Sequence, residues 1–141
     1  MIALREGVLL ALVAALPAAI AVGFHPELAD RVRAGLPADA VRAAEMAAWS
    51  VPVLWVDIRE AEAIARGHIP GAIAFDESAF SESLGGIVAV WEPGQAIVVY
   101  CDSTACARSR EVAQRLREAG FTDVYYLHGG WEAWSATHAT P

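Results

Sequence analysis

A buried strand that ends on a cysteine is the feature that most constrains this chain. Residues 96–100 are apolar and rich in β-branched side chains, Cys101 follows directly, and small residues then lead into a helical pattern near Arg108. A continuous apolar run of this length is typical of a strand buried inside a parallel sheet. A strand, a short loop and a helix place a reactive group at the carboxyl edge of the sheet, where α/β proteins bind their ligands.

Cys101 is therefore the candidate nucleophile. Loop amides and the N-terminus of the following helix both stabilise an anion, so they favour the thiolate, which is the reactive form of cysteine. Asp102 acts against them, because a neighbouring carboxylate disfavours a second negative charge. The alternative is an inert cysteine, buried at a strand end as a small apolar side chain.

Strand and helix patterns alternate along the chain, which predicts an α/β domain with a small parallel sheet flanked by helices. We expect strands at 53–58, 73–75, 96–101 and 124–127. Helices are expected at 38–49, 60–66 and 108–119 and from 129 onward, and one or two turns within 77–90 should be interrupted by Gly85 and Gly86.

The segment from Val8 to Phe24 is apolar almost throughout and predicts an N-terminal apolar helix that is a signal peptide or a membrane anchor. Its length is close to the roughly 17 residues that can span a bilayer, and Ala19 and Ala21 fit a small-x-small cleavage site. The remaining alternative is a buried helix of a soluble protein. Either of the first two would place the domain outside the cytoplasm, anchored to the cytoplasmic membrane or exported after cleavage.

The expected organisation has three parts. A signal or transmembrane segment covers residues 1–25, a linker with a short helix covers 26–50, and the α/β domain covers 51–141.

Composition limits the partners and cofactors. The formal net charge of −7 argues against nucleic acid, whose phosphates need a basic face. The chain has two cysteines and four scattered histidines, so we expect no disulfide scaffold, no metal site and no cofactor. In an oxidising compartment Cys106 could act as a resolving thiol that closes a disulfide with Cys101, since their Cα atoms could lie within about 7 Å.

Three blocks of sequence resemble the rhodanese superfamily. The first combines residues 56–59 with the turn at 67–72, the second is Cys101 with its loop, and the third is residues 129–134. The resemblance extends from residue 51 to 134 and implies a parallel sheet with the cysteine at the base of a cradle of backbone amides. It also implies a sulfurtransferase, in which Cys101 takes a sulfane sulfur from a donor such as thiosulfate and passes it from a persulfide to a thiol or cyanide. A redox or sulfur-carrier protein is a possible partner.

The same resemblance indicates which residues form the site. Asp57, Arg59 and His68 are expected to support it structurally. Arg108 is the first cation after the cysteine and is expected to bind an anionic donor, the alternative being a plain surface residue. The loop is longer than the family's usual one and begins with a carboxylate, so we expect weak activity toward thiosulfate. Substrate binding is assigned to the segment that follows the cysteine: Asp102, Ser103, Thr104, Ala105, Cys106, Ala107 and Arg108.

Other functions remain open, because a fold does not by itself decide function. One is a thiol–disulfide or redox module that uses Cys101 and Cys106. Another is a rhodanese-like binding module without catalysis. A phosphatase or arsenate reductase ranks last: related folds bind oxyanions with a Cys-x5-Arg loop, whereas six residues separate Cys101 from Arg108 here, and oxyanion sites tolerate little misplacement.

Overall fold

The computed structural model describes residues 35–104 and 107–138. The expected signal or anchor segment lies outside the described residues, so membrane attachment and export stay predictions. Within the described part of the chain, no helix is both long and apolar enough to cross a membrane.

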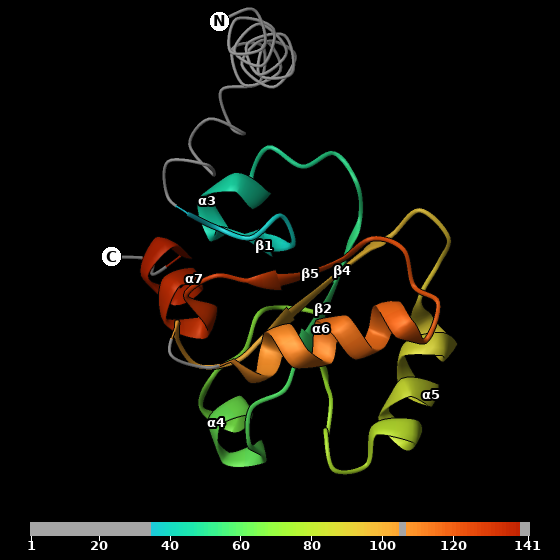
Figure 1. The fold of residues 1–141 in the computed structure, drawn as a ribbon. Coiled ribbons are helices and arrows are strands. Elements are labelled where there is room, and N and C mark those ends of the chain that lie inside the picture. Colours follow the sequence, from blue (N-terminus) through green and yellow to red (C-terminus); the bar gives the residue numbers. More distant parts are fainter. Residues whose placement is uncertain (1–34, 105–106, 139–141) are drawn as a thin grey trace, which may run out of the picture. The chain divides into compact units, whose positions relative to one another are not determined.

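The described residues form a five-stranded parallel sheet in the order β1-β5-β4-β2-β3 (Figure 1). The central strand β4 pairs with β2 from Val53↔Ala96 to Asp57↔Tyr100, and all five of its residues are buried. Neighbouring strands and helices on both faces leave β4 no solvent face, which explains its continuous apolar run. The strands are β1 (Ala40–Val41), β2 (Val53–Asp57), β3 (Ile73–Ala74), β4 (Ala96–Tyr100) and β5 (Val124–Leu127).

Helices cover both faces of the sheet and divide the core into two clusters. One cluster combines Ile97, Val99 and Cys101 with side chains of α5 and α6, and the other combines Val98 and Tyr100 with side chains of α3 and α7. Side chains alternate between the faces of a strand, so the cysteine faces α6 and the preceding tyrosine faces the opposite layer. The helices are α3 (Ala43–Met46), α4 (Ala61–Arg66), α5 (Phe80–Val90), α6 (Arg108–Glu118) and α7 (Gly130–His138).

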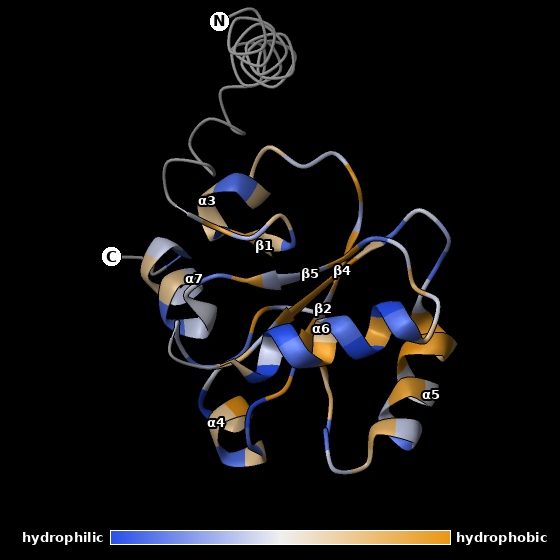
Figure 2. Cartoon of the chain, viewed as in Figure 1, coloured by the Kyte–Doolittle hydropathy of each residue, from blue (hydrophilic) through white to orange (hydrophobic). Residues whose placement is uncertain are grey.

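The amphipathic pattern of α6 confirms the helix expected at 108–119. Val112, Ala113 and Leu116 are buried against the sheet, and Figure 2 shows hydrophobic and hydrophilic residues in stripes along this helix. The same view shows β4 as hydrophobic along its length. These two elements bracket Cys101, so the strongest sequence patterns position the candidate nucleophile.

The sheet begins upstream of the expected domain boundary at residue 51. Strand β1 lies within the expected linker, yet it is buried and pairs with β5 through Ala40↔Tyr126 and Val41↔Leu127. The compact unit accordingly starts at Asp39. A strand of two residues has no periodicity of its own, which is why the pattern favours a helix over 38–49, whereas only Ala43–Met46 is helical.

Helix α5 is longer than expected, because it continues through Gly85 and Gly86 without a break. Each glycine costs about 1 kcal/mol relative to alanine in a helix interior. Burial of Ile87, with Phe80 and Leu84 packed against the same core, offsets that cost.

Gly130 sets how closely α7 approaches the cysteine loop. Its φ is +56°, and a Cβ at this position would lie 2.3 Å from the carbonyl oxygen of Cys101 and 2.8 Å from the carbonyl carbon of Asp102. At this short distance the amide of Trp131 donates to the Cys101 oxygen (2.7 Å) and that of Glu132 to the Asp102 oxygen (2.9 Å). Only glycine satisfies both the dihedral angle and the space.

We expect Gly130→Ala to lower the free energy of unfolding by roughly 2–5 kcal/mol, because a left-handed dihedral and a backbone overlap add together. Gly120→Ala is the matched control: Gly120 also has positive φ (+106°), but no atom lies within 4 Å of its Cβ position. That variant should lose only about 1–2 kcal/mol. Urea denaturation of both variants checks the prediction, and equal losses would contradict it.

Candidate active site around Cys101

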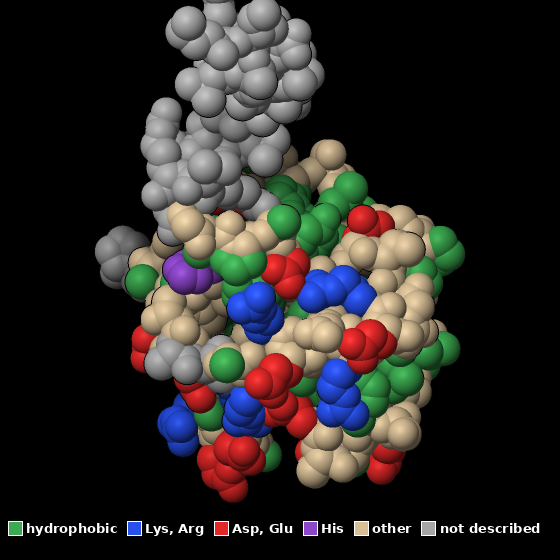
Figure 3. Space-filling view, in the orientation of Figure 1, with side chains coloured by type: hydrophobic (Ala, Val, Ile, Leu, Met, Phe, Trp, Pro, Cys, Tyr) green, Lys and Arg blue, Asp and Glu red, His purple; other side chains and the backbone are tan. Residues whose placement is uncertain are grey.

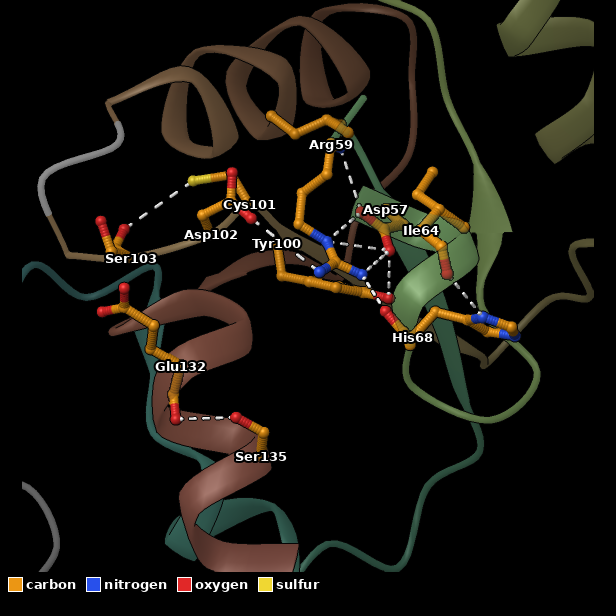
Figure 4. A network of polar contacts seen from close by, with 12 residues as sticks. Asp57, Arg59, Ile64, His68, Tyr100, Cys101, Asp102, Ser103, Glu132 and Ser135 are labelled. Carbon is orange, nitrogen blue, oxygen red and sulfur yellow. Dashed lines mark hydrogen bonds and ion pairs between the residues drawn. The ribbon is translucent and has the colours of Figure 1, made fainter. Parts of the chain in front are cut away.

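Cys101 lies directly after β4, at the carboxyl edge of the sheet, and only 2% of it is exposed. Its Sγ is 3.7 Å from the hydroxyl of Ser109. The Sγ also lies 3.8 Å from the carbonyl oxygen of Ser103 (Figure 4). Ser109 belongs to the first turn of α6 and is itself buried. A hydroxyl in this place can donate to a sulfur that carries negative charge.

The sulfur of Cys101 is in a disulfide bond. A disulfide sulfur is attacked by thiolates and is not itself a nucleophile. Reduction must therefore precede any reaction in which Cys101 attacks a donor. The expected pairing with Cys106 stays a prediction.

A buried ion pair lies beneath the loop. The guanidinium of Arg59 donates to the carboxylate of Asp57 through Nη2 (2.7 Å) and Nε (2.9 Å), and the two side chains are 2% and 1% exposed. Nη2 also donates to the carbonyl oxygen of Gly67 at 2.7 Å. Burial opposes the charge of Arg59, but the hydrogen bond and the charge of Asp57 outweigh it and raise the pKa of the guanidinium. Both residues therefore hold the segments around the cysteine in place.

Tyr100 ties this pair to two further segments. Its hydroxyl donates to Asp57 Oδ2 (2.6 Å) and accepts from the amide of Ile69 in the turn after α4 (3.1 Å). Burial and the hydrogen bond to Asp57 raise the pKa of Tyr100 well above its usual value. The phenol thus stays protonated and acts as a donor to the carboxylate.

Arg59 also reaches toward the loop itself. Its Nη1 lies 3.9 Å from Asp102 Oδ1 (Figure 4). The guanidinium also lies over the ring of Trp131, 4.7 Å from the ring centroid. The Asp102 side chain is 64% exposed, so this ion pair is worth at most about 1 kcal/mol. It nevertheless compensates part of the charge that Asp102 adds beside Cys101.

Arg108 is engaged with other groups at the same edge of the sheet. It forms an ion pair with Glu77 and donates through Nη2 to the carbonyl oxygen of Ile58 (3.1 Å). The hydrogen bond to Glu77 raises the pKa of Arg108. Its expected role in binding an anion stays a prediction, and an anion would have to share this guanidinium with a carboxylate.

The other expected site residues are spread more widely. Thr104 and Ala107 are exposed and Ser103 is half-buried, whereas Ala105 and Cys106 lie outside the described residues, so the amide cradle stays a prediction. His68 is exposed, with Nδ1 3.3 Å from the carbonyl oxygen of Ile64, and Figure 4 shows it pointing away from Cys101. Among the described residues, no three His, Cys, Asp or Glu side chains are grouped as metal ligands.

Sequence reasoning did not single out Tyr100, Ser109 or Glu77. A tyrosine at the end of a fully buried strand must find a partner for its hydroxyl, and Asp57 at the end of a second such strand was a candidate. Ser109 and Glu77 carried no comparable signal, because a polar residue near a helix start is ordinarily a cap or solvent-exposed.

Removal of the Tyr100 hydroxyl tests the buried network. Tyr100→Phe leaves the Ile69 amide without its acceptor, so the free energy of unfolding at neutral pH should fall by roughly 1–3 kcal/mol. The pKa of Tyr100 is raised in the folded state. The protonated phenol therefore stabilises the fold in full below about pH 10, the pKa of tyrosine in the unfolded chain. This contribution is lost as the pH rises further.

Urea midpoints at neutral and alkaline pH measure this effect. The wild type should lose stability above about pH 10 more steeply than Tyr100→Phe. Tyr125→Phe, which alters a half-buried tyrosine of β5, is the control and should behave as the wild type. Parallel alkaline slopes for wild type and Tyr100→Phe would contradict the account.

Ser109→Ala tests the hydroxyl beside the sulfur in reduced protein. Loss of one hydrogen bond to the thiolate should slow alkylation of Cys101 by iodoacetamide near neutral pH by roughly two- to tenfold. Ser103→Ala is the control, since only the backbone carbonyl of Ser103 contacts the sulfur. An unchanged alkylation rate in Ser109→Ala would show that the hydroxyl does not act on the thiolate.

Comparison with known proteins agrees with this geometry. The family model of the rhodanese-like domain matches residues 39–137. A thiosulfate sulfurtransferase GlpE from Pseudomonas putida (strain GB-1) is 37% identical over 83 residues, which are 59% of this chain and 70% of that protein. Its namesake from Shewanella oneidensis is 36% identical over 84 residues, or 60% of this chain and 77% of that protein.

A solved structure supports the same assignment. The BH2092 protein from Bacillus halodurans superposes with a TM-score of 0.60 at 25% identity, covering 80% of this chain and 82% of that one. The match of the family model to most of the chain, with the cysteine at the end of β4, shows that this chain belongs to the rhodanese-like domain family.

Proposed function

We propose that this domain is a sulfurtransferase that carries sulfane sulfur as a persulfide on Cys101. The observation that carries the proposal is the position of this cysteine, at the carboxyl edge of the sheet with the first turn of α6 facing its sulfur. The relatives named thiosulfate sulfurtransferase support the same reaction type. The donor is a sulfane compound such as thiosulfate, and the acceptor is a thiol or cyanide.

The reaction has two displacement steps. The Cys101 thiolate attacks the outer sulfur of thiosulfate, a new S–S bond forms, the S–S bond of the donor breaks, and sulfite leaves with the electron pair. An acceptor thiolate or cyanide then attacks the terminal sulfur of the persulfide, and the Cys101 thiolate is released. The first step needs a reduced and positioned Cys101 thiolate as the nucleophile, and the second releases the same thiolate as the leaving group.

The surrounding residues mainly position Cys101 and take little part in making or breaking bonds. The Asp57–Arg59 pair and the Tyr100 hydroxyl fix the ends of β2 and β4, while amides at the start of α7 hold the carbonyl oxygens of Cys101 and Asp102. The Ser109 hydroxyl can donate to the sulfur itself. A nucleophile held in this way loses little orientational freedom when it reacts.

A thiol–disulfide module is the second candidate, and the disulfide at Cys101 is the observation that favours it. In that function Cys101 and a second thiol would exchange a disulfide with a partner dithiol, and sulfur transfer would be incidental. The two functions differ in their need for Cys106: persulfide transfer needs one thiol, whereas disulfide exchange needs two.

Cys101→Ser should abolish persulfide formation, because a hydroxyl at this position cannot attack a sulfane sulfur at a useful rate. Cys106→Ser should keep most of it. The measurement is intact-protein mass spectrometry of reduced protein after incubation with thiosulfate, where a gain of one sulfur atom that a reductant removes identifies the persulfide. Equal loss in both variants would favour the disulfide module.

A further inference from the structure

A cavity of about 750 Å³ opens at the carboxyl edge of β2 and β3. Ile58, Phe75 and Arg108 are among its walls. Ile58 and Phe75 belong to the same core cluster as Cys101, and the amide of Ile58 donates to the carbonyl oxygen of Tyr100, the residue before the cysteine. The cavity and the nucleophile therefore share one edge of the sheet.

The cavity is larger than the small donors and acceptors require. Pockets that hold organic ligands have volumes of about 300–1,000 Å³, whereas cyanide and thiosulfate consist of a few atoms. Ala61, Ile64 and Phe75 provide apolar wall surface. This space suits an organic molecule that carries the accepting thiol.

Negative charge dominates the polar part of the wall. Glu60, Asp76 and Glu77 line the cavity together with two guanidinium groups, those of Arg59 and Arg108. Arg59 is neutralised by Asp57, which lies outside the lining, and Arg108 by Glu77. Acidic and basic side chains meet at the lower edge of the molecule in Figure 3, near α4 and the start of α6. The lining thus keeps a surplus of carboxylates.

Hydrogen bonds and neighbouring charges act on the charged groups of the wall. Asp76 accepts hydrogen bonds from the amide (2.8 Å) and the hydroxyl (2.6 Å) of Ser78, which lowers its pKa. Arg108 feels the charges of Glu77, Glu60 and Asp102, all of which raise its pKa. Arg108 thus feels the charge of three carboxylates, of which Glu77 is its ion-pair partner.

We propose that this cavity receives the acceptor of the sulfur-transfer step and that the acceptor is a thiol with a positive charge, such as an ammonium group. The inference rests on the proposed function, because it assumes a persulfide on Cys101. A cationic group in the cavity gains attraction from Glu60 and Asp76, whereas an anionic thiol is repelled by them. Exposed carboxylates at contact distance make this a preference of roughly five- to tenfold.

The transfer step is balanced without an outside oxidant. The acceptor thiol loses its proton to solvent, and its thiolate attacks the terminal sulfur of the Cys101 persulfide. A new S–S bond forms on the acceptor, the S–S bond of the enzyme breaks, and Cys101 leaves as the thiolate. The product is the persulfide of the cationic thiol.

The test uses full-length reduced protein loaded with thiosulfate and freed of excess donor. Cysteamine, 2-mercaptoethanol and 3-mercaptopropionate are cationic, neutral and anionic thiols of similar size. The decay of the enzyme persulfide is followed by mass spectrometry, and rates are expressed per thiolate present. Cysteamine should react roughly five- to tenfold faster than 3-mercaptopropionate, and added salt should reduce this ratio.

Glu60→Gln should reduce the preference for cysteamine over 3-mercaptopropionate by several-fold. Glu62→Gln is the matched control, because Glu62 is an exposed glutamate of α4 outside the lining. Equal rates for the three thiols, or equal effects of the two substitutions, would overturn the inference and leave the proposed function standing. Failure of thiosulfate to form any persulfide would instead refute the proposed function and this inference with it.

Discussion

The buried ion pair between Asp57 and Arg59 is the interaction on which the candidate site depends. Two charged side chains this far from solvent are tolerated only when their remaining donors and acceptors are also satisfied. The Tyr100 hydroxyl and the carbonyl oxygen of Gly67 provide those partners. The pair therefore fixes the ends of β2 and β4 and the turn after α4 relative to one another.

The position of the sulfur then follows from the alternation of side chains along β4. Val99 and Cys101 face α6, whereas Val98 and Tyr100 face α3 and α7. A shift of one residue would exchange the two faces, so the cysteine would meet the ion pair and the tyrosine would meet α6. The bond from Tyr100 to Asp57 holds the register that keeps Cys101 beside Ser109.

The sequence predicts the features that depend on strong local patterns. The apolar run of β4 and the amphipathic pattern of α6 predicted the parallel sheet. Together with the three blocks that resemble rhodaneses, they also singled out Cys101. Strand β1 was missed because two residues have no period, and its partner β5 is far away in the chain. The pairing of Arg108 with Glu77 was missed for a related reason: it joins α6 to the segment before α5, and no local pattern encodes such a contact.

Charge connects the two halves of the proposed reaction. Within the described residues at this edge, Arg59 and Arg108 are each paired with a carboxylate, so an anionic donor would have to share a guanidinium with that carboxylate or depend on uncharged hydrogen-bond donors. We therefore propose weak use of thiosulfate, because the carboxylate partner of each guanidinium would compete with a bound anion. Glu77 pairs with Arg108 and works against an anion, while in the proposed acceptor step Glu60 and Asp76 of the same cavity wall favour a cation. Both proposals would thus follow from the surplus of carboxylates at this edge of the sheet.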